Sequence, residues 1–228
     1  RASDAATRVE MYALFARAYA ATDPTRFATD LAAKRDVILL RDGTGRIAGF
    51  TTLSVFDDKD NGAPIRCVFS GDTIVDPVFW GTQALNFAWI RHMAHIRAER
   101  PDAPLYWLLI SKGFRTYRYL STFARDYVPR SDDRDNAALA ALRDRLAARL
   151  FGAVFDPDTG IVAHTPPRDR LSDPLAALPQ RGNAAREAAY FARSNPGYAK
   201  GDELVCLCAL DPANMRPFAR RLYEKARA

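Results

Sequence analysis

The chain has 228 residues, enough for one sizeable domain or two small ones, and it is 48% hydrophobic and 26% charged, as globular proteins commonly are. No run of about 18 apolar residues is present, which excludes a membrane-spanning helix. A net charge of +6 favours an anionic partner, such as a phosphate-bearing cofactor, an acidic protein or nucleic acid. Because the arginines are spread along the chain without forming a block, a solvated basic surface is the simpler explanation.

The cysteines indicate the redox environment. Cys67, Cys206 and Cys208 are odd in number and lie in apolar, strand-like runs. They are therefore predicted to be reduced core residues and not a disulfide framework. No signal peptide is recognisable in the sequence as given. We expect a cytoplasmic protein.

The first part of the chain predicts helices followed by an antiparallel meander. Apolar residues at helical spacing, ended by Asp23-Pro24, predict a helix over residues 7–21, and similar signals predict another over 24–34. Residues 36–41 (DVILLR) predict a buried strand that an Asp-Gly turn at 42–45 joins to a returning strand over 46–56. Residues 57–61 are predicted to be a charged connection to a central strand that begins near Ile65.

The stretch 68–93 (VFSGDTIVDPVFWGTQALNFAWIRHM) is the predicted centre of the fold. An apolar run ending at Val75 predicts a strand, Asp76-Pro77 predicts a turn, and residues 80–83 are predicted to be the first turn of a helix. Such a strand, turn and helix N-terminus presents unpaired backbone N–H groups to an anion, usually a phosphate. The alternative is a purely structural joint, because most αβ proteins have several such turns.

The second part of the chain alternates helices and strands. Residues 105–110 (LYWLLI) predict a strand buried on both faces, and its helical connection to the central strand indicates parallel pairing. Residues 137–150 predict an amphipathic helix capped by Asp135 or Asn136. The remaining predictions are a helix over 114–127, a hairpin over 151–164, a loop over 165–182, a helix over 183–193, a strand over 203–210 and a helix over 212–225.

This order of elements, with Gly49-Phe50 in the second strand and Ile74-Val75-Asp76-Pro77 before the central turn, resembles the GCN5-related N-acetyltransferase (GNAT) superfamily. The resemblance covers roughly residues 9–127. It implies an α/β fold in the broad sense, an α+β arrangement of helices around a mixed sheet. We therefore expect one domain over residues 1–228, with a GNAT-like core at about 7–130 and a C-terminal α/β elaboration at about 131–228. The final apolar strand is expected to lie inside the sheet of the core.

The resemblance also implies a cofactor loop with an altered motif. In that family the loop after the fourth strand has the pattern Arg/Gln-x-x-Gly-x-Gly/Ala, and its backbone amides hold the pyrophosphate of acetyl-coenzyme A. On residues 80–85 of this chain Gly81 fits, whereas Trp80, Gln83 and Leu85 depart from the pattern. Either the acyl donor is held differently, for instance on an acidic acyl-carrier protein, or the fold is kept without catalysis. The implied cofactor-binding residues are Val75, Trp80, Gly81, Thr82, Gln83 and Lys112. Trp80 could instead be a packing or lid aromatic.

Catalysis in this family needs a base for the attacking amine and an acid for the leaving thiolate. The resemblance implies Asp72, a carboxylate in an otherwise uncharged strand, as the base, and Tyr119 or Tyr117 as the acid. Asp72 could instead be a turn or bulge residue bonded to backbone, and both tyrosines could be packing aromatics. Lys112, Arg115 and Arg118 would form a positive rim beside the cofactor, or simply a solvated helix face.

Other constellations predict little. His92 and His95 lie three residues apart without a recognisable third ligand, so no metal site is expected. The aromatic and basic residues of 114–127 are explained by an amphipathic helix, so a nucleic-acid partner is not expected. Two hypotheses remain. The chain is an acyltransferase that moves an acyl group from a coenzyme A or carrier-protein thioester to a small-molecule amine or other nucleophile, or it is a non-catalytic GNAT-like protein that binds an anionic ligand or an acidic partner.

Overall fold

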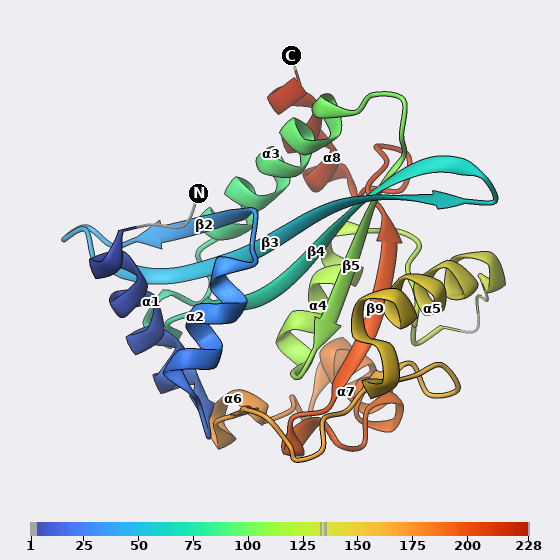
Figure 1. Cartoon of the computed structure of the whole chain (residues 1–228). Coiled ribbons are helices and arrows are strands. Elements are labelled where there is room, and N and C mark those ends of the chain that lie inside the picture. The colour runs from blue at the N-terminus through green and yellow to red at the C-terminus, as the bar shows by residue number, and fades with distance from the viewer. Residues whose placement is uncertain (1–3, 133, 135, 228) are drawn as a thin grey trace.

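The computed structural model describes residues 4–132, 134 and 136–227, and its core is one mixed seven-stranded sheet (Figure 1). The strand order is β2-β3-β4-β5-β9-β7-β6. β4 and β5 are parallel, and the other neighbours are antiparallel, which confirms the predicted mixed α/β fold. The strands in this order are β2 (Asp36–Arg41), β3 (Ile47–Asp60), β4 (Ala63–Val75), β5 (Leu105–Ser111), β9 (Glu203–Ala209), β7 (Ile161–Val162) and β6 (Phe155–Asp156). A separate pair joins β1 (Tyr19–Ala20) to β8 (Arg170–Leu171).

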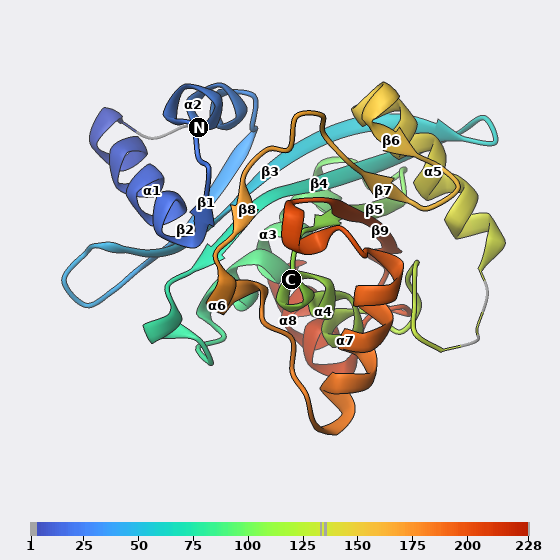
Figure 2. The ribbon, with the colours of Figure 1, turned by 90° about the horizontal axis from the view of Figure 1, so that it is seen from below.

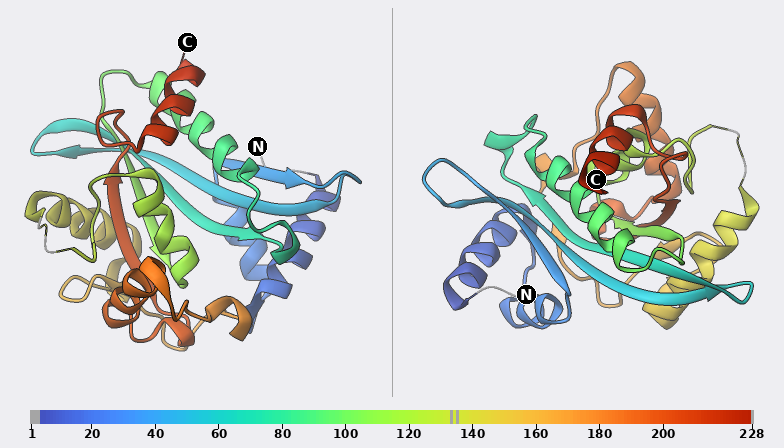
Figure 3. Two further views of the ribbon diagram at one scale, coloured as in Figure 1. Left: turned by 180° about the vertical axis from the view of Figure 1, so that it is seen from behind. Right: turned by 90° about the horizontal axis from the view of Figure 1, so that it is seen from above.

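Helices cover both faces of the sheet (Figure 2). One face carries α1 (Ala5–Ala18) and α2 (Pro24–Ala32) over β2 to β4, and α5 (Ala137–Phe151) over β5 and β9. The other face carries α3 (Ala84–Glu99), α4 (Phe114–Phe123), α7 (Gly182–Ser194) and α8 (Pro217–Arg227), which lie in front in the rear view (Figure 3). A short helix, α6 (Asp173–Ala176), lies in the connection to α7. None of the helices among the described residues is long and apolar enough to cross a bilayer.

The C-terminal strand lies inside the sheet, as predicted. β9 pairs with β5 on one side and β7 on the other, and six of its seven residues are buried. Cys206 and Cys208 on this strand, and Cys67 on β4, are buried free thiols, which confirms the prediction of reduced core cysteines. The elaboration after residue 131 therefore completes the same sheet that the N-terminal part begins.

Two irregularities in β4 open the sheet locally. Leu53 pairs with Ser70 and Thr51 with Thr73, so Thr52 alone opposes Gly71 and Asp72 in a β-bulge. A Cβ at Gly71 would lie 2.7 Å from the Thr52 hydroxyl, which explains the glycine. Pairing of β4 with β5 stops at Ser70 and Leu109, although both strands continue with their outer neighbours. Beyond this point β4 and β5 diverge.

Several predicted boundaries are wrong because tertiary contacts override local signals. Residues 57–60 are not a connection but the end of β3, which turns at Asn61-Gly62, and the Asp58 carboxylate there is neutralised by Arg149 at 2.7 Å. β2 is an edge strand and only half-buried. The N-terminal helix ends at Ala18, because Tyr19 and Ala20 pair with β8.

Further differences lie around the second half of the chain. The helix predicted over 114–127 ends at Phe123, since Ala124 forms a β-bridge with Met215, and the last helix begins only at Pro217. The loop predicted over 165–182 contains β8 and α6. Asn136 is the N-cap of α5 and accepts a hydrogen bond from the Leu139 amide, whereas Asp135 lies outside the described residues.

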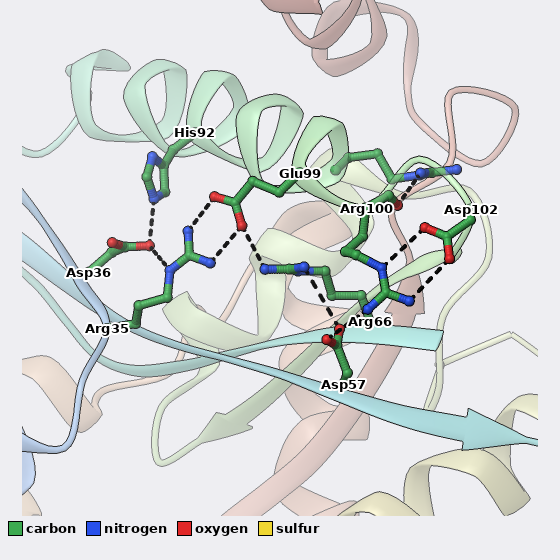
Figure 4. Close-up of polar contacts among 9 residues, drawn as sticks. Arg35, Asp36, Asp57, Arg66, His92, Glu99, Arg100 and Asp102 are labelled. Atoms are coloured by element: carbon green, nitrogen blue, oxygen red, sulfur yellow. Dashed lines mark hydrogen bonds and ion pairs between the residues drawn. The ribbon is translucent and has the colours of Figure 1, made fainter. Parts of the chain in front are cut away.

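A chain of ion pairs joins α3 to the sheet (Figure 4). Glu99 at the end of α3 accepts hydrogen bonds from both terminal guanidinium nitrogens of Arg35, at 2.8 and 2.6 Å, and from one of Arg66 at 2.6 Å. Asp36, the first residue of β2, accepts from Arg35 at 2.9 Å and contacts His92 at 3.0 Å. The network therefore ties the edge strand and β4 to the same helix.

We expect Glu99→Gln to lower the free energy of unfolding by about 1 kcal/mol at most, because the pair is half-exposed and screened. Hydrogen bonding to Arg35 lowers the pKa of Glu99. A carboxyl group with a lowered folded-state pKa contributes stability above its unfolded pKa and loses it as the pH falls through the folded one. The difference between the variant and the original protein in urea titrations should thus vanish in acid. A difference that stays constant down to pH 2 would contradict the ion-pair explanation.

Candidate active site

A cavity of about 1080 Å³ lies where β4 and β5 diverge. Its walls come from α1 and α2, from residues 71–75 of β4, from the start of α3, from α4 and from the segment 164–179. In the view from below, the segment that carries β8 runs between α2 and α5, in front of the sheet (Figure 2). Segments that are far apart in the sequence therefore meet around one space.

The cavity gathers most of the residues that the sequence predicted. Asp72, Val75, Trp80, Gly81, Thr82, Gln83, Lys112 and Tyr119 all line it. Tyr117 is not among the lining residues. It is 1% exposed, and its hydroxyl donates a hydrogen bond of 3.0 Å to the carbonyl of Pro129. This geometry gives Tyr117 a packing role, and of the two predicted tyrosines Tyr119 is the one that lines the cavity.

The loop before α3 differs from the predicted helical turn. Pro77–Phe79 form a 3₁₀ turn, and α3 begins only at Ala84, with Gln83 at the N-cap. Gly81 has φ = 94°, a left-handed conformation that glycine adopts without strain. The Thr82 amide donates to the Phe79 carbonyl at 3.2 Å and is therefore used within the loop. Gln83, Leu85 and Asn86 at the start of α3 line the cavity, and the N–H groups of a first helical turn have no intrahelical acceptor.

Trp80 lies at the rim of the cavity and not in the core. Its side chain is attached to the end of β4, because the indole Nε1 donates a hydrogen bond of 3.0 Å to the Val75 carbonyl. The guanidinium of Arg115, near the start of α4, lies 3.8 Å from the centre of its ring, a cation–π contact. Trp80 remains 39% exposed. The pair spans the rim of the cavity between α4 and the loop before α3.

The end of β4 offers an open strand edge. The Asp76 amide donates to the Ala48 carbonyl of β3 at 2.8 Å. Because backbone groups alternate sides along an antiparallel strand, the N–H groups of Val75 and Thr73 point away from β3, toward the divergence. The Val75 carbonyl points the same way, as its bond with the Trp80 indole shows. This edge can pair with an extended chain that carries amides.

Asp72, on the bulge, is a half-buried carboxylate inside the cavity. Burial raises its pKa, and Asp169 and Asp30 add to the rise, whereas the ammonium groups of Lys112 and Lys34 oppose it. No hydrogen bond within the described part of the chain occupies its side chain. Asp72 is thus a carboxylate with a raised proton affinity and free acceptor atoms, as a general base requires.

A buried charge cluster forms the floor beside Asp72. Lys112 directly follows β5, and its ammonium lies 2.6 Å from Asp169 and 3.5 Å from Glu203. It also lies 5.4 Å from the centre of the Tyr19 ring. Burial disfavours the charge on Lys112, but Glu203, Tyr19 and Asp169 outweigh it, so its pKa rises. Burial likewise raises the pKa of Glu203, against the opposing effect of Lys112.

Sequence reasoning missed three members of this cluster. The sequence predicts Tyr19 within a helix, Asp169 within a loop, and Glu203 at the start of an apolar strand. The one available signal was a single carboxylate opening the run ELVCLCAL, because an acidic residue at the edge of a buried strand needs a partner.

The β2-β3-β4 meander and the parallel β4–β5 pair match the order of elements on which the sequence resemblance rests. The fold is GNAT-like. In this GNAT-like core Tyr119 lies on α4, its ring stacked on Phe123 with centroids 5.7 Å apart. Burial raises the pKa of Tyr119, against the opposing charge of Arg115, so the phenol stays protonated.

No protein-family model matches the sequence, and no curated protein does. Solved structures with a similar fold include a probable N-acyltransferase from Enterococcus faecalis, with 16% identity, a TM-score of 0.42, and coverage of 55% of this chain and 31% of that one. A GNAT family N-acetyltransferase from Escherichia coli in complex with CoA has 14% identity, a TM-score of 0.39 and coverage of 54% and 66%. A Trypanosoma brucei acetyltransferase has 19% identity, a TM-score of 0.39 and coverage of 55% and 92%. The chain thus spans less than two thirds of the first two of these proteins.

Proposed function

We propose that the protein is an acyltransferase that moves an acyl group from a coenzyme A or carrier-protein thioester to a small amine or other nucleophile. The observation that carries the proposal is the position of Asp72. Its free carboxylate lies in the same cavity as an open strand edge and the start of a 16-residue helix. Acyl transfer from a pantetheine thioester needs three parts: a base, a surface that binds an extended arm with amides, and an anion site.

The donor would lie along β4 toward α3. The open edge at Thr73 and Val75 suits the amides of a pantetheine arm, which occurs in both coenzyme A and carrier proteins. Beyond it, the N–H groups at the start of α3 suit phosphate, and Arg115 and Arg118 line the same end of the cavity. The net charge of +6 suits either donor, since both are acidic.

The chemical step would use two residues of this chain. Asp72 would accept the proton that the acceptor amine loses as its nitrogen bonds to the acyl carbon. Tyr119 would donate a proton to the thiolate sulfur as the carbon–sulfur bond breaks. The raised pKa values of both groups suit these roles. A carboxylate with a raised pKa is a stronger base, and a phenol with a raised pKa is still protonated when the thiolate forms.

Titration with acetyl-coenzyme A tests the donor site. A ligand that binds only the folded state at 100 times its dissociation constant adds about 2.7 kcal/mol, so the melting temperature should rise by roughly 5–10 °C for a chain of this size. Acetyl-pantetheine, which lacks the nucleotide phosphates, should need a higher concentration for the same rise. No response to acetyl-coenzyme A or to an acylated carrier protein would contradict the proposal.

The alternative is a non-catalytic protein that binds an anionic ligand or an acidic partner at the same place. One observation favours it: Trp80, which packs against Arg115, stands where the family loop has Arg or Gln. Under this alternative, donor binding would raise the melting temperature without any acyl transfer. An assay of thiol release with a panel of amines separates the two hypotheses. Only an acyltransferase would release thiol faster with an amine present than by hydrolysis of the donor alone.

A further inference from the structure

The cavity has a second, apolar side away from α3. Five half-buried or buried apolar side chains line it between β4, β5, β7 and the end of α5: Phe69, Ile110, Phe151, Val154 and Val162. The rings of Phe69 and Phe151 meet edge to face, with centroids 5.7 Å apart. This wall belongs to the core cluster under α5, yet it faces the cavity and so is available to an apolar group of a ligand.

A cation that forms no ion pair within the described part of the chain lies between this wall and Asp72. The Lys34 ammonium lies 5.1 Å from the centre of the Phe69 ring, and a Cβ built on Gly71 would lie 3.0 Å from it. Lys34 is half-buried and lines the cavity. Among the described residues no carboxylate lies within 4 Å of it, whereas Lys112, which lines the same cavity, has Asp169 and Glu203. A partly desolvated ammonium with no carboxylate in ion-pair contact, among the residues that the structure describes, favours an anionic group.

These groups are spaced like the parts of one small molecule. Lys34 touches the position of Gly71, Asp72 is the next residue on the bulge, and Phe69 lies directly under the Lys34 ammonium. An anion at Lys34 and an amine at Asp72 would therefore be separated by about the width of one residue. An apolar substituent between them would reach the Phe69 and Phe151 rings.

We propose that the acceptor is an α-amino acid with an apolar or aromatic side chain, with its carboxylate at Lys34, its amine at Asp72 and its side chain on the wall formed by Phe69 and Phe151. The inference rests on the proposed function, because it assigns the acceptor side of the same cavity. It also explains why the cavity extends past the divergence of β4 and β5 toward α5, farther than a donor along β4 requires.

Three probes separate the contributions of the acceptor. L-phenylalanine carries the carboxylate, the amine and the ring, phenethylamine lacks the carboxylate, and L-serine lacks the ring. We expect L-phenylalanine to bind at least tenfold more tightly than either of the others in calorimetric titrations. In Lys34→Met the affinity for L-phenylalanine should fall about 10- to 100-fold, the usual effect of losing a hydrogen bond to a charged group, while that for phenethylamine stays within twofold. Lys225→Met, at an exposed position on α8, is the matched control and should change neither.

The result that overturns the acceptor proposal is an equal effect of Lys34→Met on L-phenylalanine and phenethylamine, or equal binding of all three probes. Calorimetry with the amino acid alone does not depend on acyl transfer. If L-phenylalanine binds as expected but acetyl-coenzyme A and acylated carrier protein do not, the proposed function fails and the amino-acid site stands. If the donors bind and phenethylamine is acylated as fast as L-phenylalanine, the function stands and the amino-acid proposal fails.

Discussion

Asp72→Asn should lower the turnover rate by about 10²- to 10⁴-fold, the usual contribution of a positioned general base, while the affinity for the acyl donor stays nearly unchanged. The amide cannot accept the amine proton, but it keeps the shape of the side chain on the bulge. The measurement is single-turnover transfer from acetyl-coenzyme A together with donor binding by calorimetry. Asp158→Asn, at an exposed position in the hairpin between β6 and β7, controls for the loss of a carboxylate and should be fully active.

The pH dependence distinguishes this role from a structural one. A base with a raised pKa gives a rate that rises with pH through that pKa and then levels off, and Asp72→Asn should remove this rise. The stability of the fold should change with pH in the opposite direction to the rate. A carboxyl group whose folded-state pKa is raised stabilises the fold while protonated and loses that contribution as the pH rises above its unfolded value. The variant should therefore be at least as stable at neutral pH as the original protein. Full activity of Asp72→Asn would remove Asp72 from the mechanism.

Tyr119→Phe should lower the rate less than Asp72→Asn, because solvent can protonate a thiolate. The two variants also separate steps. Loss of the base slows transfer to every amine, whereas loss of the acid should matter least for donors whose thiol has a low pKa. If Tyr119→Phe lowered the transfer rate equally for donors of different thiol pKa, Tyr119 would not be the acid, and its role would be packing against Phe123.

The sequence predicted the parts of the fold that depend on local periodicity. The run LYWLLI and the run ELVCLCAL have few polar residues, and they are the two adjacent central strands β5 and β9. The bulge that carries Asp72 was one of the alternatives that the sequence left open at this residue. These features could be predicted because a buried strand must be apolar along its length and a bulge tolerates glycine and a polar residue.

The remaining features depend on contacts between distant segments. The pairing of Tyr19 with Leu171 spans most of the chain, and no local pattern announces a two-residue strand. The ion pairs of the β3–β4 extension with α5 turned an expected connection into strand. The Lys112 cluster joins the ends of β5 and β9 to the residue before β8, so it exists only in the folded chain. The sequence predicts Lys34 at the end of a helix, whereas its contact with Phe69, 35 residues further along the chain, forms only in the folded protein.

Removal of the ammonium group from the buried cluster should have the largest effect on stability. In Lys112→Met the side chains of Asp169 and Glu203, which are 10% and 12% exposed, would lose their shared counter-ion. Removal of one partner from a buried ion pair costs about 3–5 kcal/mol, because it leaves an uncompensated charge. We expect this loss in guanidinium titrations. Lys200→Met, at an exposed position in the turn Tyr198–Lys200, is the matched control and should have little effect.

The pH dependence of the Lys112→Met variant follows from Glu203. Burial already raises the pKa of Glu203, and loss of the Lys112 charge would raise it further. A carboxyl group with a raised folded-state pKa stabilises the fold in acid and loses that contribution as the pH rises above its unfolded pKa. The loss of unfolding free energy in Lys112→Met should therefore be small near pH 4 and grow toward pH 8. Glu203→Gln added to the variant should recover part of the loss at neutral pH. A loss below about 1 kcal/mol that does not change with pH would show that water screens the cluster, as at a surface ion pair. The segment before β8 would then be held over the cavity by the packing of Leu171 against Gly113, where a Cβ would lie 2.5 Å from the leucine side chain, and not by charge.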